Sequence, residues 1–180
     1  MPETAVQRIL REILEYRCPR YDQLPDIPLY SDQITDALNR LTAPLLGEDH
    51  AITAPMINNY VKQRLLPPPE KKRYGRDHLA TLYCIALLKQ TFTISEIDAM
   101  LRIQTLSYPF PVAYDYFCSE LESALQAAFS TREFASSCAT RVTPESELVR
   151  TAALSIAHKL FATKFIQLYA PTDHTAQPNP

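Results

Sequence analysis

Glycine is nearly absent from this chain. Gly47 and Gly75 are the only glycines among its 180 residues. Phosphate-binding loops and dinucleotide-binding motifs need several glycines at fixed spacing, so both are excluded, and the tight turns of strand-rich folds depend on glycine as well. Fifteen prolines separate the segments instead, and 46% of the residues are hydrophobic, which is enough to bury a core. We therefore expect an all-α protein.

Hydrophobic periodicity predicts seven helices with prolines or polar turns between them. After the first helix we expect a proline-spaced connector, because proline and the residue before it disfavour the helical conformation. Tyr16, Tyr21 and Tyr30 flank this connector and are expected to pin it to the core. The expected helices span residues 4–16, 31–44, 53–66, 76–90, 93–103, 112–130 and 145–169.

Three of these helices begin at a residue that commonly caps a helix. Ser31 and Thr53 are expected N-caps, and Pro55 falls in the first turn of the third helix, where its missing N–H costs little. Thr93 followed by Glu96 is a capping-box pattern. These signals predict where the central helices begin.

Positive charge is concentrated in one stretch of the chain. The net charge is −2 and the pI about 6.1, which is not typical of a nucleic-acid-binding protein as a whole. Residues 53–76 carry six Lys and Arg against one acid, a local charge of +5 that leaves −7 for the rest. A basic patch on an acidic body suits local binding to a phosphate backbone, although an ordinary solvated surface would show the same pattern.

The central segments follow the order of a helix-turn-helix unit, in which the second helix of the pair enters the DNA major groove. Amide side chains pair with adenine or donate to phosphates. Several amide and basic side chains lie opposite the apolar face of the predicted helix 53–66. The candidate DNA contacts on this helix are Thr53, Asn58, Asn59, Lys62, Gln63 and Arg64.

The segment that follows this helix is basic and is expected to form a wing. Three prolines, 67–69, would stiffen its start and lower the cost of ordering it on binding. Two roles stay open for Tyr74: its hydroxyl could donate to a phosphate, or its ring could pack at the edge of the core. The candidate contacts on the wing are Lys71, Lys72, Arg73, Tyr74 and Arg76.

Residues 24–103 resemble a bacterial domain family of unknown function. The family's motifs are "LYxDQ", "MINNYxK", "LLPPPxKKxY" and "LKxxxSIxEI". They correspond here to Leu29–Gln33, Met56–Lys62, Leu65–Tyr74 and Leu88–Ile97.

More distantly, the same stretch is similar to the DNA-binding domain of the MerR regulators. The positions that match that pattern are Thr53, Ile57, Tyr60, Leu65, Leu66, Tyr74 and Thr93–Ile97. Asn58 stands where those regulators usually have a phosphate-binding arginine, Asn59 where they have tyrosine, and Arg64 where they have glycine.

The MerR resemblance implies a winged helix-turn-helix core with additional helices at both ends, and a sequence-specific transcription regulator that binds double-stranded DNA as a homodimer. The C-terminal helices would supply the dimer contact and could hold a small-molecule effector. The predicted regions are an N-terminal helix and connector (1–23), the MerR-like DNA-binding domain (24–107), the C-terminal dimerisation or effector region (108–170) and a disordered tail (171–180).

A second interpretation is a protein–protein adaptor that uses the winged-helix scaffold without binding DNA. The low pI favours it, and so does the loss of the phosphate-binding arginine at Asn58. The position of the acids decides between the two: acids that intrude on the basic face would favour the adaptor.

Other chemistry finds little support in the sequence. The cysteines at 18, 84, 118 and 138 form no C-x-x-C pair, so no metal site is expected; Cys84 and Cys118 are expected on buried helix faces. The Asp77–His78 pair alone is too weak to indicate catalysis, so we expect neither an enzyme nor a cofactor.

No apolar run approaches the ~20 residues that cross a bilayer, and no signal-peptide core follows the start, which predicts a cytoplasmic protein.

Overall fold

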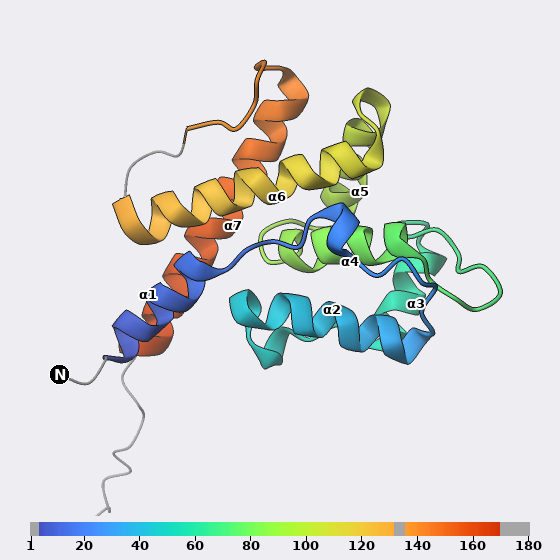
Figure 1. Ribbon diagram of the computed structural model, residues 1–180, viewed down its shortest axis with the longest axis horizontal. Coiled ribbons are helices and arrows are strands. Elements are labelled where there is room, and N and C mark those ends of the chain that lie inside the picture. Colours follow the sequence, from blue (N-terminus) through green and yellow to red (C-terminus); the bar gives the residue numbers. More distant parts are fainter. Residues whose placement is uncertain (1–3, 132–135, 170–180) are drawn as a thin grey trace, which may run out of the picture.

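The computed structural model describes residues 4–131 and 136–169, and within these ranges its regular structure consists of helices without strands (Figure 1). The all-α prediction is therefore confirmed. A 3-10 turn lies at Tyr21–Gln23, another at Glu48–His50, and a π-helical turn at Ala127–Thr131. The α-helices are α1 (Ala5–Glu15), α2 (Ser31–Leu46), α3 (Ala54–Lys62), α4 (Arg76–Leu88), α5 (Ile94–Ser107), α6 (Phe110–Gln126) and α7 (Pro144–Tyr169).

Helix α4 lies at the centre of the molecule. Every residue from Leu82 to Leu88 is buried, and a helix that is apolar on all sides is one that neighbours surround. It packs against α2 on one side and against α6 and α7 on the other (Figure 1). One hydrophobic core therefore runs from the central helices into the C-terminal helices. The region boundaries expected at 23, 107 and 170 stay predictions, and the tail 171–180 lies outside the described residues.

Helix α7 crosses α6 and packs against it within the same chain (Figure 1). Its buried face includes Ile156 and Ala157, both fully buried. Phe161 on α7 meets Phe129 at 5.1 Å between ring centres and stacks on Phe165 at 4.3 Å. The apolar surface of α7 packs inside the fold, against α6 and also against α1, α4 and α5. None of the described helices is long and apolar enough to cross a membrane.

The connector between α1 and α2 is fixed by two of the three tyrosines expected to hold it. The Tyr16 hydroxyl donates to the carbonyl of Leu41 at 2.8 Å and lies 2.7 Å from the Tyr83 hydroxyl. The Tyr21 ring packs edge-on against Tyr114 of α6. The expectation for Tyr30 is wrong, because this side chain is 48% exposed and turns toward the basic residues described below.

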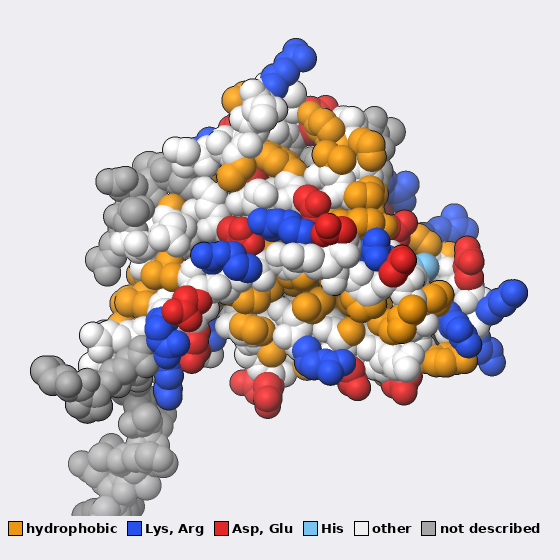
Figure 2. Space-filling model, in the orientation of Figure 1, with side chains coloured by type: hydrophobic (Ala, Val, Ile, Leu, Met, Phe, Trp, Pro, Cys, Tyr) orange, Lys and Arg blue, Asp and Glu red, His pale blue; other side chains and the backbone are white. Residues whose placement is uncertain are grey.

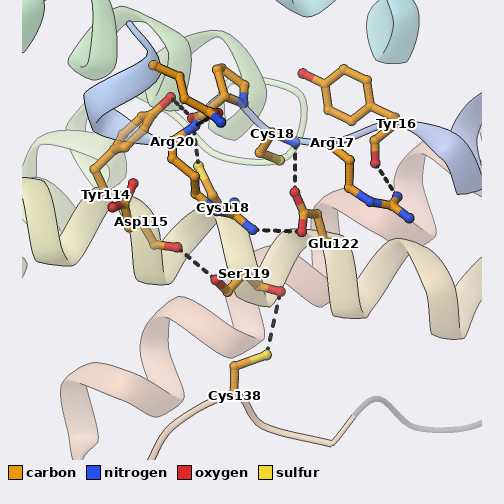
Figure 3. A network of polar contacts seen from close by, with 12 residues as sticks. Tyr16, Arg17, Cys18, Arg20, Tyr114, Asp115, Cys118, Ser119, Glu122 and Cys138 are labelled. Carbon is orange, nitrogen blue, oxygen red and sulfur yellow. Dashed lines mark hydrogen bonds and ion pairs between the residues drawn. The ribbon is translucent and has the colours of Figure 1, made fainter.

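Helix α6 anchors the same connector through its polar side chains (Figure 3). The Glu122 carboxylate accepts from the backbone N–H of Cys18 and from Arg20 Nη2, both at 2.8 Å. The Tyr114 hydroxyl donates to the carbonyl of Pro19 at 2.9 Å, and the Asp115 carboxylate accepts from the Tyr21 N–H at 2.7 Å. Helix α6 therefore holds the path of a segment that leads directly to the central helices.

The helix ends follow local capping only in part. The Thr93–Glu96 capping box is confirmed, with both reciprocal hydrogen bonds present. Helix α2 instead has Tyr30 as its N-cap, because the side chain of Gln33 accepts from the Tyr30 N–H at 2.9 Å, so the prediction of Ser31 was wrong by one residue. The helix also passes Pro44 and ends at Gly47, whose φ of 80° lies in the left-handed region that glycine adopts without strain.

Candidate nucleic-acid interface

Helix α3 presents one polar face to solvent. Ile57 and Tyr60 are buried, at 0% and 5% exposure, and they attach the helix to the core. Pro55 lies in the first turn, as expected, but the Thr53 side chain makes no capping hydrogen bond. The residues predicted to contact DNA from this helix lie at i, i+1, i+4 and i+5 spacing, which places them on one helix face. These exposed residues are Asn58, Asn59, Lys62 and Gln63.

Helix α3 ends earlier than the predicted residue 66, in a Schellman motif. The Arg64 N–H donates to the carbonyl of Val61 and the Leu65 N–H donates to the carbonyl of Tyr60, both at 3.0 Å. In this motif the residue that donates the inner bond adopts a left-handed conformation, and glycine is the usual residue there. Here Arg64 occupies the position with a φ of 62°. The exposed Arg64 side chain is therefore displayed at a sharp corner directly after the polar helix face.

The loop from residue 63 to residue 75, called the basic loop below, contains a second sharp corner. The Arg73 N–H donates to the carbonyl of Glu70 at 2.8 Å and closes a two-residue turn. The two corner residues are Lys71 and Lys72, with φ values of 47° and 65°. Positive φ at both positions is the geometry of a type I′ turn, which strongly favours Asn-Gly or Gly-Gly. Both lysine side chains are exposed at this corner.

Among the described residues, the non-glycine positions with positive φ are Arg64, Lys71 and Lys72. All three are basic, all three are exposed, and all three belong to the predicted contact set. A left-handed conformation costs an L-residue about 1–2 kcal/mol, and such strain concentrates at functional sites. The chain thus tolerates local strain at the positions that display positive charge.

The basic loop is joined to the core through its last residues. Leu29 and Tyr74 exchange reciprocal backbone hydrogen bonds of 2.8 Å. The Tyr74 side chain is 3% exposed and packs edge-on against His78, with ring centres 5.4 Å apart, and burial raises the pKa of Tyr74. Of the two roles left open for Tyr74, the structure supports the packing one, so this residue anchors the loop.

Two arginines of the predicted contact set already have partners in the folded chain. Arg73 Nη2 donates to the Tyr30 hydroxyl at 2.8 Å, and its guanidinium lies 4.8 Å from the centre of the Tyr30 ring. Arg76 forms an ion pair with Asp26 at 3.1 Å, and its guanidinium lies 5.4 Å from the centre of the Tyr21 ring. Both tyrosines were missed as members of this surface. The only sequence signal was an aromatic residue on each side of the proline-spaced connector.

The Tyr21 hydroxyl is itself held in place. It donates to the carboxylate of Asp77 in the first turn of α4. Burial, this hydrogen bond and the nearby Asp77 charge raise the pKa of Tyr21 to about 12. The hydroxyl therefore remains a donor at neutral pH, and the ring under Arg76 has a fixed orientation.

The segment that builds this surface coincides with a known protein family. Residues 19–117, more than half of the chain, match the family described as "Domain of unknown function (DUF1836)". The chain belongs to the DUF1836 family. No curated protein matches the sequence, and no solved structure matches the fold. The DUF1836 region begins in the connector and ends in α6, so it contains both tyrosines, the polar face of α3 and the whole basic loop.

Acidic residues border the basic loop of the DUF1836 region. Lys and Arg side chains gather at the end of the molecule where this loop projects, and acidic side chains lie beside them (Figure 2). Asp26 pairs with Arg76, and Glu70 and Asp77 lie in the same cleft between the loop, the connector and α4. Glu70 is the first residue of the turn that displays Lys71 and Lys72, so acids lie both at this corner and at the base of the loop.

The DUF1836 region and α7 also enclose an apolar cavity of about 50 Å³ between α4, α5, α6 and α7. Cys84, Phe110 and Val149 are among its lining residues. A cavity of about 150 Å³ can hold benzene, so this cavity is smaller than one known to hold a small aromatic ligand. Cys84 and Cys118 are buried, as predicted. The described residues contain no group of three His, Cys, Asp or Glu side chains that could hold a metal ion.

Proposed function

We propose that this protein is a sequence-specific DNA-binding transcription regulator with a MerR-like winged helix-turn-helix core. Helix α3 would lie in the major groove, and the basic loop would act as the wing on the backbone. The observation that carries the proposal is the set of strained basic corners at Arg64, Lys71 and Lys72. Local stability favours glycine or asparagine at these positions, so a separate demand for positive charge accounts for the residues found there.

Base reading would fall to the exposed face of α3. Asn58 and Asn59 are exposed, and neither contributes to the buried face of the helix. Asparagine amides can pair with the N6 and N7 edge of adenine. The Schellman corner at Arg64 stands where the MerR pattern has glycine, and its left-handed backbone supports that distant resemblance.

We further propose that the regulator is a cytoplasmic homodimer, because two-fold symmetry lets two recognition helices meet half-sites about one helical turn apart. Helix α7 packs mostly on α6, so the dimer contact would use surface that α7 and α6 leave open. Tyr108, Val112 and Val142 are exposed apolar residues of the C-terminal region, at 39%, 54% and 67% exposure. A small-molecule effector would bind among the same C-terminal helices.

A selection from a random duplex library with the purified full chain tests DNA binding and sequence preference together. If each protomer neutralises about four to five phosphates, log affinity should fall with log salt at a slope of roughly −4 per protomer. A slope near zero would contradict the proposal. The triple change Lys71→Ala, Lys72→Ala, Arg73→Ala should weaken binding to all sequences, whereas Asn59→Ala should change the selected motif at particular bases and leave the salt slope unaltered.

The adaptor function stays the second candidate, and one observation favours it. Asp26, Glu70 and Asp77 border the basic loop, and a mixed-charge surface of this kind also suits a protein partner. The library selection separates the two: failure to enrich any duplex, with a purified chain that remains folded, would favour the adaptor.

A further inference from the structure

Two guanidiniums are oriented in advance at the base of the basic loop. Arg73 lies over the ring of Tyr30 and Arg76 lies over the ring of Tyr21. A guanidinium presents parallel N–H donors that match two oxygens of a phosphate. Because the stacked rings already restrict the arginine side chains, less conformational entropy is lost when an anion binds.

Both arginine–tyrosine pairs line the same cleft. This cleft has a volume of about 780 Å³ and lies between the connector, the basic loop and the first turn of α4. Lys71 adds a third cation to its wall, and Glu70 and Asp77 add two acids. Asp77 already accepts from the Tyr21 hydroxyl, so one of the two acids is engaged in holding the aromatic support.

Two buried donors of residues in this wall have no acceptor among the described residues. They are Arg76 Nε and His78 Nε2. His78 Nδ1 accepts from the Gly75 N–H at 3.0 Å, so Nε2 of the neutral ring carries the hydrogen. Buried donors are nearly always paired, so water or an anion would satisfy these two.

On the outer side of Arg76, the Asp26 carboxylate pairs with the guanidinium as an anion from outside the chain would. Its Oδ1 lies 3.1 Å from Arg76 Nη2, and the Asp26 side chain is 88% exposed. An ion pair this exposed contributes little to stability. The carboxylate can therefore swing into solvent when another anion approaches Arg76.

We propose that this cleft binds one backbone phosphate of the DNA between Arg73 and Arg76, and that this phosphate displaces Asp26. The inference rests on the proposed DNA binding and extends it. Tyr21 and Tyr30 are positioning residues, which act by orienting the two arginines. The DUF1836 match begins at residue 19, so the connector that carries both tyrosines is part of the same unit as α3 and the basic loop.

Asp26→Asn and Asp22→Asn form a matched pair of variants for the DNA test. Both remove one exposed negative charge from the connector, but only Asp26 pairs with Arg76. In fluorescence anisotropy with a selected duplex, Asp26→Asn should tighten binding about two- to five-fold at low salt, and Asp22→Asn should do clearly less. Equal effects of the two variants, in a chain that does bind DNA, would overturn the cleft as the phosphate site and leave the proposed function standing.

Tyr30→Leu tests the positioning role separately. Loss of the ring and hydroxyl should weaken DNA binding several-fold while the salt slope stays unchanged, because Arg73 keeps its charge but loses its orientation. Tyr30→Phe keeps the ring and should fall between Tyr30→Leu and the unmodified chain. If Tyr30→Leu binds as tightly as the unmodified chain, Tyr30 has no such role.

Titration of the full chain with inorganic phosphate distinguishes DNA phosphate from free phosphate. The arginine Nε–H signals of Arg73 and Arg76 should shift saturably in NMR spectra, more readily in Asp26→Asn. Phosphate binding together with DNA binding supports the inference. Phosphate binding without DNA binding assigns the cleft to a free phosphate and overturns both the DNA phosphate and the proposed function, and no response in either assay overturns them as well.

Discussion

The backbone N–H of Arg73 donates to the carbonyl oxygen of Glu70 across 2.8 Å, and the two residues enclosed by this bond, Lys71 and Lys72, both have positive φ. The tightest turn of the basic loop therefore consists of two lysines in a geometry that favours asparagine and glycine. Substitution of these lysines should therefore change the stability of the fold and the affinity for DNA in opposite directions, and each quantity can be measured separately.

The double change Lys71→Asn, Lys72→Gly should stabilise the fold and weaken DNA binding. Relief of the left-handed strain should raise the free energy of unfolding by about 1 kcal/mol. Loss of two phosphate contacts should reduce the magnitude of the salt slope by about 1.8 per protomer. Urea denaturation and anisotropy measure the two effects. Lys159→Gln, a change of an exposed lysine on α7, is the control and should alter neither quantity.

Arg64→Gly should also stabilise the protein, because glycine is the usual residue at the left-handed position of a Schellman motif. We expect a gain of about 1 kcal/mol in the free energy of unfolding. If Arg64 contacts a phosphate, the salt slope should fall in magnitude by about 0.9 per protomer. Arg64→Lys retains both the charge and the strain and should behave like the unmodified chain. A loss of stability in Arg64→Gly would show that the arginine side chain supports the fold.

Glu120 is expected to be the most sensitive polar residue of the C-terminal helices. Its carboxylate is 1% exposed and accepts from the Tyr116 hydroxyl, the Ser137 hydroxyl and the Cys138 N–H at 2.7, 3.0 and 2.7 Å. Glu120→Ala leaves these donors without an acceptor and should cost about 3 kcal/mol of unfolding free energy. Glu120→Gln retains one carbonyl oxygen and should cost less. Urea denaturation of the two variants provides the comparison, and equal costs would show that packing rather than hydrogen bonding is lost.

The capping box of α5 should make a pH-dependent contribution to stability. The backbone N–H of Thr93, and then its hydroxyl, lower the pKa of Glu96 by donating to the carboxylate. A lowered folded-state pKa means that the stabilisation is present above the unfolded-state pKa and is lost as the pH falls through the folded-state value.

Thr93→Ala should therefore raise the pKa of Glu96 toward its usual value, because the hydroxyl donor is lost. NMR titration of the Glu96 carboxyl group measures the change. The stability difference between Thr93→Ala and the unmodified chain should also shrink in acid. An unchanged Glu96 titration would mean that the hydroxyl makes no contribution in solution.

Local patterns predicted the helices well. The all-α class, the burial of Cys84 and Cys118 and the Thr93–Glu96 cap all followed from local patterns, which depend on residues a few positions apart. The same rules placed the start of α2 at Ser31 and the end of the third helix at residue 66. The start of α2 at Ser31 is confirmed, but its N-cap is Tyr30, whose N–H donates to the Gln33 side chain. The end at residue 66 was wrong, because a Schellman turn ends α3 at Lys62.

The composition of the candidate interface was also predicted, since Asn58, Asn59 and the basic residues of the loop are exposed as expected. Their arrangement was not. No sequence rule places lysine at both corners of a type I′ turn or arginine at a helix end that favours glycine, because propensities point to other residues there.

By itself the sequence determined an all-helical chain, the faces that its helices bury and a local excess of positive charge, since these properties depend on neighbours along the chain. Only the tertiary structure decided that Tyr21 lies under Arg76, that Tyr30 lies under Arg73, and that α6 holds the connector that carries both tyrosines. These partners are more than forty residues apart along the chain. Their contact exists because burial of α4 draws the connector and the basic loop to the same end of one core.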